Sequence, residues 1–252
     1  MRYSTELVAL YHAHHCQQPE DISFWVGLAE ERGAPVLELG CGSGRVALAL
    51  ARAGYSTYGL DREAGMLAYL AAQVEAEIRP RLHIFQADLT QFHLAQRFPL
   101  IILPCNTYST LSPGERRSAL HCAARHLQAG GCFAVSLPNP AGLADLPSLS
   151  DPELEAIFPH PWDGEPVQVS AGWRRSAGQI IFDWHYDHLL PDGRVSRHSL
   201  QVYQNLTTVE VYLEEFLLAG LKPAFLYGDY QRLSYSPAAP HLILGVTHTG
   251  PG

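Results

Sequence analysis

The chain has 252 residues, of which 47% are hydrophobic and 17% charged, and its formal net charge is −8. This length suits one α/β domain with an insertion, and the composition excludes an intrinsically disordered protein. The negative charge, without any basic run, argues against a protein that follows nucleic-acid phosphates. No apolar run reaches membrane-spanning length, no signal-peptide core is visible, and the five cysteines lack C-x-x-C spacing, so we expect a cytoplasmic protein with free thiols.

The first segment, residues 4–33, is predicted to form one or two helices with a break near Pro19. It contains the run His12-Ala13-His14-His15-Cys16, in which His12 and Cys16 are one helical turn apart, as two metal ligands can be. Because no second group of ligands is evident in the sequence, we predict no metal site.

Residues 35–61 are typical of a strand, a glycine-rich turn, a helix and a second strand closed by Asp61. In such a βαβ unit glycines let the backbone approach a ligand over the strand ends, and an acid about 20 residues on can bind two ribose hydroxyls. The spacing here is G-x-G-x-G, and Glu38 stands two residues before the first glycine. A carboxylate at that place disfavours a pyrophosphate and suits a cationic ligand, so we predict a nucleoside that carries positive charge.

This stretch resembles the first motif of the class I S-adenosylmethionine-dependent methyltransferases, E/D-x-G-x-G-x-G. The resemblance implies S-adenosylmethionine as methyl donor and S-adenosylhomocysteine as product. It continues into the D-x-S-x-x-M-L run at 61–67, an acid after the third strand, and an N-terminal tyrosine across the donor. The cofactor-binding residues implied are Tyr11, Glu38, Gly40, Cys41, Gly42, Gly44, Asp61, Arg62, Met66, Asp88, Leu89 and Pro104. Met66 as a plain core residue and Asp88 as a helix cap are the structural alternatives.

The remaining regular segments alternate between strands and helices. We expect helices over 62–77, from 113 to Gly130-Gly131, and over 207–219, and strands over 81–86, 98–103, 132–137, 222–227 and 241–247. The last helix is predicted to bury Val211, Phe216 and Leu217. The predicted fold is α/β: a Rossmann-like, seven-stranded, mostly parallel sheet with helices on both faces and an antiparallel last strand.

Residues 104–108 follow the fourth strand, where the acceptor is met in this fold. They are not the [DNS]-P-P-[YFW] tetrapeptide of DNA amino-methyltransferases. The run 106–111 instead resembles the N-S-F-x-x-L segment of glycine and sarcosine N-methyltransferases, and Gly228-Asp229-Tyr230 resembles their G-D-[FY] turn. The resemblance implies a substrate-orienting amide at Asn106; a turn-forming asparagine is the alternative.

Residues 138–205 interrupt the alternation. The proline-rich first part predicts a loop-rich cover, and strands follow over 167–173, 179–190 and 195–203. We interpret them as a small antiparallel sheet inserted after strand 5 and laid over the substrate; an extension of the core or a dimer contact are the alternatives. The expected organisation is a single domain, 1–252, with a helical segment at 1–33, a core at 34–137 and 206–248, and the inserted cover at 138–205.

Methyl transfer depends mainly on orientation and exclusion of water, and aromatic faces can stabilise the cation. The candidate catalytic residues are Asn106, the possible base His185, and the aromatic Tyr186. No arginine follows the fifth strand where the glycine enzyme holds its carboxylate, which makes glycine a doubtful substrate unless Arg174 or Arg175 reaches in from the cover. We predict methyl transfer to a small molecule, with an amine nitrogen preferred; O-methylation, protein methylation or non-catalytic donor binding are the alternatives. We expect no nucleic-acid or membrane partner, and a monomer or homodimer.

Overall fold

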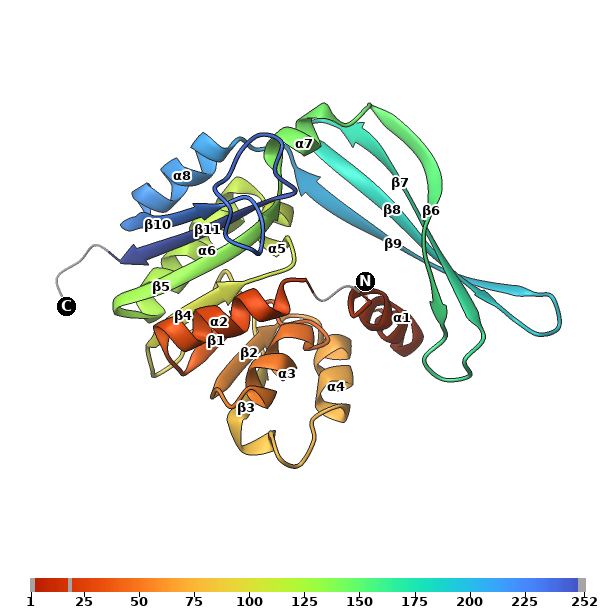
Figure 1. Cartoon of the computed structure of the whole chain (residues 1–252), viewed down its shortest axis with the longest axis horizontal. Coiled ribbons are helices and arrows are strands. Elements are labelled where there is room, and N and C mark those ends of the chain that lie inside the picture. The colour runs from red at the N-terminus through yellow and green to blue at the C-terminus, as the bar shows by residue number, and fades with distance from the viewer. Residues whose placement is uncertain (1–2, 18–19, 249–252) are drawn as a thin grey trace.

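The computed structural model describes residues 3–17 and 20–248 and contains a seven-stranded and a four-stranded sheet (Figure 1). The larger sheet has the order β10-β11-β5-β4-β1-β2-β3. Its strands are β1 (Val36–Leu39), β2 (Thr57–Asp61), β3 (Leu82–Gln86), β4 (Phe98–Leu103), β5 (Leu127–Pro138), β10 (Leu221–Tyr227) and β11 (His241–His248). Only β11 runs against both of its neighbours. The predicted Rossmann-like sheet is confirmed, and its strand order reverses between β1 and β4, where ligands bind in such folds.

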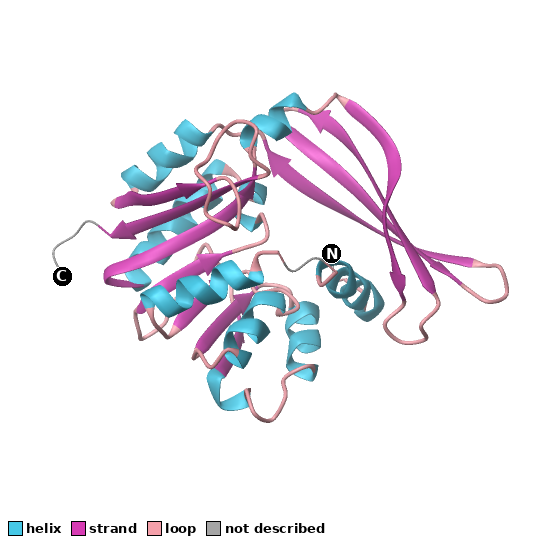
Figure 2. Ribbon diagram, in the orientation of Figure 1, coloured by secondary structure: helices cyan, strands magenta, loops and turns pink. Residues whose placement is uncertain are grey.

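Helices cover both faces of this sheet (Figure 2). The helices are α1 (Thr5–His15), α2 (Ile22–Arg32), α3 (Arg45–Arg52), α4 (Ala64–Ala72), α5 (Thr107–Thr110), α6 (Pro113–His126), α7 (Pro140–Asp145) and α8 (Val209–Leu218). Alternate residues of a strand face opposite sides, so Leu37 and Leu39 pack with α6 and α8, whereas Val36 packs with α2 and α3. Glu38 therefore lies on the same side as α2 and α3, within the core.

Several predicted boundaries differ from the structure. Helix α4 ends at Ala72, five residues before the predicted end. Helix α6 ends at His126, because Leu127 is already extended and pairs with Phe98, so Gly130-Gly131 lie inside β5. The predicted break at Pro19 lies outside the described residues.

The apolar face predicted for α8 is also wrong in two of three positions. Phe216 is buried, but Val211 and Leu217 are 41% and 54% exposed. Tyr212 and Phe216 are one helical turn apart and face the sheet together, which turns the two aliphatic side chains outward.

The inserted segment forms an antiparallel sheet, which we call the cover sheet. It consists of β6 (Leu149–Pro159), β7 (Pro166–Ser176), β8 (Gln179–Leu189) and β9 (Val195–Asn205), in that order. The loop predicted for its first part is wrong, since α7 and β6 occupy that segment. Proline is compatible with β6 because this strand is at the edge and Pro152 falls where the register shifts between Ser150 and Glu153.

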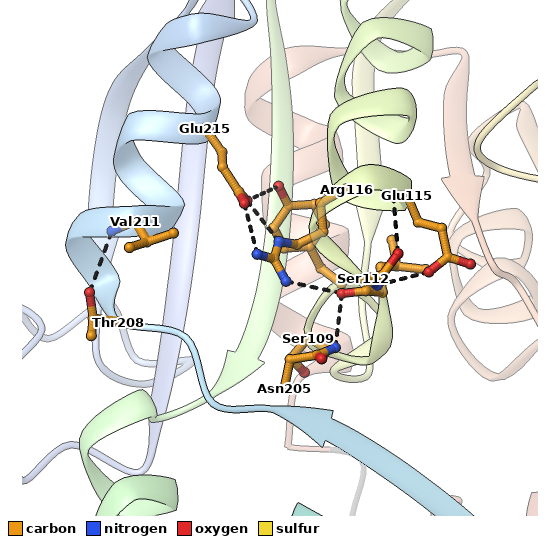
Figure 3. Close-up of polar contacts among 10 residues, drawn as sticks. Ser109, Ser112, Glu115, Arg116, Asn205, Thr208, Val211 and Glu215 are labelled. Carbon is orange, nitrogen blue, oxygen red and sulfur yellow. Dashed lines mark hydrogen bonds and ion pairs between the residues drawn. The ribbon is translucent and has the colours of Figure 1, made fainter. Parts of the chain in front are cut away.

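A polar junction fastens the cover sheet to the core (Figure 3). At the end of β9, Asn205 Nδ2 donates to the carbonyl oxygens of Ser109 and Leu111, each at 2.9 Å. Next to it, Arg116 of α6 forms a bidentate ion pair with Glu215 of α8, with both N–O distances 2.7 Å. The cover sheet is thus fixed beside α5, which follows directly on the predicted acceptor-binding residue Asn106.

Helix α1 lies between the core and the cover sheet (Figure 1). Leu7 and Leu10 pack against Phe158, Val167 and Tyr186 of the cover sheet. Within 3–17 and 20–248, no helix combines the length and apolar character that crossing a membrane requires.

Candidate active site

The glycine loop between β1 and α3 owes its shape to three residues with positive φ, Gly40, Gly42 and Gly44. A Cβ on Gly44 would lie 2.1 Å from Leu70 Cδ1, so close packing of this loop against α4 also requires glycine. At the end of β2, Asp61 Oδ2 accepts a hydrogen bond from the Gly42 N–H at 2.8 Å. The carboxylate is thereby held against the loop, as a ribose-binding acid must be.

Two adjoining cavities form a groove over the ends of β1 and β2, which we call the donor groove. Both are lined by Gly40, Asp61 and Thr107. The first, about 160 Å³, is lined by Tyr11, His15, Glu38, Gly40, Cys41, Gly42, Ser43, Arg45, Val46, Asp61, Glu63, Met66, Cys105 and Thr107. The second, about 170 Å³, is lined by Gly40, Leu60, Asp61, Arg62, Ala87, Asp88, Leu89, Thr90, Thr107, Thr110, Leu111 and Glu115.

The donor groove brings together most of the predicted cofactor residues. Tyr11, Glu38 and Met66 lie at one end, and Asp88 and Leu89 at the other. Two predicted residues line neither part. Gly44 is the loop glycine that packs against Leu70 of α4, and Pro104 is buried directly after the end of β4.

Glu38 places a buried carboxyl in the first part of the groove. Its side chain is 2% exposed, and Oε2 has no hydrogen-bond partner among the described residues. Burial raises the pKa of this carboxyl from 4.5 to about 8. An unsatisfied buried carboxyl beside a ribose-binding aspartate fits a positively charged nucleoside such as S-adenosylmethionine.

A larger cavity of about 490 Å³, the acceptor cavity, adjoins the donor groove. His15, Arg45 and Cys105 line both. Its lining comes from α1, α3, β6, β8, β11 and the loops after α1, β4 and β10: His14, His15, Gln17, Glu20, Asp21, Arg45, Cys105, Asn106, Glu155, Ala156, Trp184, Tyr230 and His241. The cover sheet contributes Glu155, Ala156 and Trp184 to this lining, and its role as a cover over a substrate stays a prediction.

The three candidate catalytic residues have different positions. Asn106 lines the acceptor cavity in a left-handed conformation, with φ 62°. His185 points to the opposite face of β8 from Trp184, lies 2.7 Å from Ser199 Oγ and does not line the acceptor cavity, so its role as a base stays a prediction that this position does not support. Tyr186 is fully buried behind His14, whose Nδ1 is 3.2 Å from the Tyr186 hydroxyl. Tyr186 can position His14 but does not face the cavity.

Residues 36–131 match the family model described as "Methyltransferase domain". This segment is a methyltransferase domain. A curated protein of Geobacillus sp. (strain WCH70), named as a methyltransferase, is 30% identical over 76 residues, which is 30% of this chain and 30% of that protein.

Solved structures extend the likeness of the methyltransferase domain to the whole fold. An S-adenosylmethionine-dependent methyltransferase from Clostridium acetobutylicum ATCC 824 matches with a TM-score of 0.79, covering 95% of this chain and 98% of that chain at 13% identity. The sugar N-methyltransferase KedS8 from Streptoalloteichus sp ATCC 53650 matches with a TM-score of 0.75, covering 98% and 94% at 19% identity. The prediction of a class I methyltransferase is confirmed for the domain and the fold. The finer resemblance to the glycine and sarcosine enzymes stays a prediction.

The sequence analysis did not name His15 as a site residue, although it lines both the donor groove and the acceptor cavity. Its Nδ1 is 2.9 Å from the Tyr11 carbonyl oxygen, which can only accept, so Nδ1 carries the proton and Nε2 has the free lone pair. The ring stacks on Tyr11 and Trp184, with centroid distances of 4.0 and 5.3 Å. Burial lowers the pKa of His15 to about 4, which keeps it neutral. The four-residue spacing of Tyr11 and His15, which places both on one helix face, was the available signal.

Arg45, at the start of α3 in the methyltransferase domain, was missed as well. It forms a bidentate ion pair with Asp21 at 2.5 and 2.7 Å, and its Nη2 donates to Cys105 Sγ at 2.8 Å. This pair neutralises both charges. Glu155 faces the same cavity 3.6 Å from His14. Burial lowers the pKa of His14 and raises the pKa of Glu155, so both side chains are biased toward their neutral forms until a cationic group enters the cavity.

Proposed function

We propose that the protein transfers a methyl group from S-adenosylmethionine to an amine nitrogen of a small molecule. The observation that supports this most directly is the junction of the two sites: a groove suited to a cationic nucleoside opens, at His15, Arg45 and Cys105, onto an acceptor cavity of about 490 Å³. A protein that only bound the donor would not require such a cavity beside it.

The donor residues divide by the part of the molecule that they recognise. In this proposal Asp61 binds the ribose hydroxyls and Glu38 lies beside the positively charged end. Asp88 Oδ1 is fixed by the N–H and hydroxyl of Thr90, at 2.8 and 2.7 Å, and we assign its other oxygen to the exocyclic amine of adenine. S-adenosylmethionine supplies an activated methyl group when bound, so the chain's own task is to orient the acceptor and exclude water.

The acceptor cavity favours an amine over a hydroxyl. A carboxylate, Glu155, and an aromatic face, Trp184, both attract a cationic amine before it loses its proton. The pKa of His15, about 4, makes it a weak base, too weak to ionise an alcohol. A neutral amine already carries the lone pair that attacks, and His15 Nε2 needs only to accept a hydrogen bond from its N–H. The match with the sugar N-methyltransferase KedS8 directs the choice of acceptors to test toward amino sugars.

The reaction can be written with its atoms balanced. The amine nitrogen forms the new N–CH3 bond as the S–CH3 bond breaks, and the electron pair of that bond stays on sulfur, which yields S-adenosylhomocysteine. The extra proton on nitrogen leaves to water. Asn106 is assigned to hold the acceptor in line, through its side-chain amide at the edge of the cavity.

The test is a panel of amino sugars and other small amines, each paired with its hydroxyl analogue, incubated with methyl-labelled S-adenosylmethionine. We expect label on nitrogen in at least one amine and no transfer to its hydroxyl partner. Asp61→Ala is the control, because it should weaken S-adenosylhomocysteine binding by at least about tenfold, or ~1.4 kcal/mol, and abolish labelling at low donor concentration. Labelling of hydroxyls alone would contradict the amine assignment. Donor binding without turnover in the panel and in a metabolite extract would contradict an enzyme.

A further inference from the structure

A cluster of titratable side chains lies outside the donor groove and the acceptor cavity, where α1 contacts the cover sheet. Its members come from the first turn of α1, the turn between β6 and β7, and strands β8 and β9: Glu6, His160, Asp163, His188 and His198. His160 and His188 are each only 4% exposed. We call this group the histidine cluster; methyl transfer does not use it.

A carboxylate stands at each edge of a stacked imidazole pair. The rings of His160 and His188 are parallel, with centroids 3.9 Å apart and an interplanar angle of 4°. Glu6 Oε1 is 3.5 Å from His160 Nε2 and 3.9 Å from His188 Nδ1. On the other edges, Asp163 lies 3.0 Å from His160 Nδ1 and 3.2 Å from His188 Nε2.

Hydrogen bonds do not satisfy the buried ring nitrogens, although carboxylate oxygens are close. Both nitrogens of His160, and Nε2 of His188 and of His198, lack a hydrogen bond of acceptable geometry to any residue in the described part of the chain. Buried polar atoms in native proteins nearly always have a partner, and those without one call for an explanation such as an ion.

We propose that the histidine cluster binds one divalent transition-metal ion, with Zn²⁺ the best match. His160 Nε2, His188 Nδ1 and Glu6 Oε1 are three ligands, from side chains whose ligand atoms all lie within 4.8 Å of one another. His198 Nε2, 3.2 Å from Glu6 Oε2, lies beside this group and is not one of its ligands. Ligands about 2.0–2.2 Å from a tetrahedral ion are about 3.3–3.6 Å apart, so modest rotations of the stacked rings bring their lone pairs onto the ion.

The donor set also indicates which metal binds. Two imidazoles and a carboxylate favour Zn²⁺ over Mg²⁺ and Ca²⁺, which prefer oxygen ligands. Asp163 contacts the ring nitrogens that face away from Glu6, the place where a carboxylate commonly orients metal-bound histidines.

A metal ion bound by the histidine cluster would join α1 to the cover sheet. Glu6 is on the same helix as Tyr11 and His15, whereas His160 directly follows β6 and His188 is on β8 of the cover sheet, so the three ligands join the helix to the sheet. An ion bound by all of them fastens α1 to the sheet and thus fixes two walls of the acceptor cavity. The alternative is a set of ion pairs between protonated histidines and the two carboxylates, without metal.

The experiment uses the full chain without a polyhistidine tag, stripped of metal with a chelator. Titration with Zn²⁺ alone, followed by calorimetry and elemental analysis, should show one ion per chain and a higher Tm, whereas Mg²⁺ should show neither. The double variant His160→Gln/His188→Gln should lose at least about 100-fold in Zn²⁺ affinity, since loss of an outer-shell partner alone costs about 10–100-fold. It should also lose the Tm increase.

His121→Gln is the matched control, because His121 is an exposed histidine on α6. It should keep both the stoichiometry and the Tm increase. The proposal is overturned if wild type binds no stoichiometric Zn²⁺, or if the double variant binds as well as wild type. If circular dichroism shows that the double variant does not fold, the test is the visible absorption spectrum of wild-type protein loaded with Co²⁺. The strong absorption of a tetrahedral Co²⁺ site supports the proposal, and its absence overturns it.

Discussion

At the scale of single residues, Glu38 couples donor binding to protonation. Burial raises the pKa of this carboxyl to about 8, so at neutral pH it is mostly protonated until a cation enters the groove. We therefore expect donor affinity to rise by up to about tenfold per pH unit toward pH 8 and then to level off. Calorimetry in buffers of different ionisation enthalpy should show release of up to one proton per donor bound at pH 7.

The same group affects stability in a defined direction. Because its folded-state pKa lies above the unfolded value, the carboxyl's contribution to folding is full below about pH 4.5 and is lost as pH rises from there to about 8. Glu38→Gln should remove both the proton release and this loss, while weakening donor binding. An unchanged pH dependence of donor affinity in this variant would contradict the role of Glu38.

His15 is the second residue with a specific expectation. It lines both the donor groove and the acceptor cavity and has a free lone pair at Nε2, so His15→Gln should lower kcat by about 10²-fold through loss of acceptor orientation. Turnover and S-adenosylhomocysteine affinity are measured separately, because His15 also lines the donor groove. His185→Gln, on the outer face of the cover sheet, should keep wild-type kcat. A lower kcat for His185→Gln together with an unchanged kcat for His15→Gln would support His185 as the site residue and contradict a role for His15.

At the scale of elements, the loop between β1 and α3 depends on a contact with α4. Gly44→Ala combines a positive φ of 89° with a Cβ 2.1 Å from Leu70, and we expect it to destabilise the protein by about 2–4 kcal/mol. Gly54→Ala is the matched control, since its φ of 100° is similar but nothing lies within 4 Å of its Cβ. It should cost only about 1–2 kcal/mol of backbone strain. Equal losses in urea unfolding would contradict the packing argument.

The elements also show where sequence patterns succeed. Strands β4 and β8 could be predicted almost to the residue because an apolar run and a strict alternation define them locally. Strand β6 could not, since proline and acidic residues are tolerated only because tertiary pairing places it at an edge with bulges. The end of α6 was misplaced because pairing of Leu127 with Phe98 overrides the helix-ending signal of Gly130-Gly131.

At the scale of the whole molecule, the acceptor cavity exists only because α1, the core and the cover sheet meet. Trp184 is the aromatic wall that the sheet supplies, so Trp184→Ala should raise the acceptor KM by about tenfold, from loss of ~1–2 kcal/mol of cation–π and apolar contact, with donor affinity unchanged. Trp173→Ala on the neighbouring strand is the control, because Trp173 does not line the acceptor cavity and lies instead in a neighbouring cavity of the sheet, which Trp184 also borders. Equal effects of the two substitutions would mean that the sheet acts through stability and not through contact.

The sequence by itself determined the donor site and the fold of the core. Glu38, the three loop glycines and Asp61 lie within one βαβ unit, so local chain geometry brings them together and their spacing is readable. The tertiary structure alone decided the acceptor side. His15, Glu155 and Trp184 come from segments far apart in the chain, and the face that each presents depends on helix and sheet packing. Adjacent residues of a strand point to opposite faces of the sheet, so Trp184 faces the acceptor cavity and His185 faces away from it. The local sequence does not show which of these two faces meets the cavity.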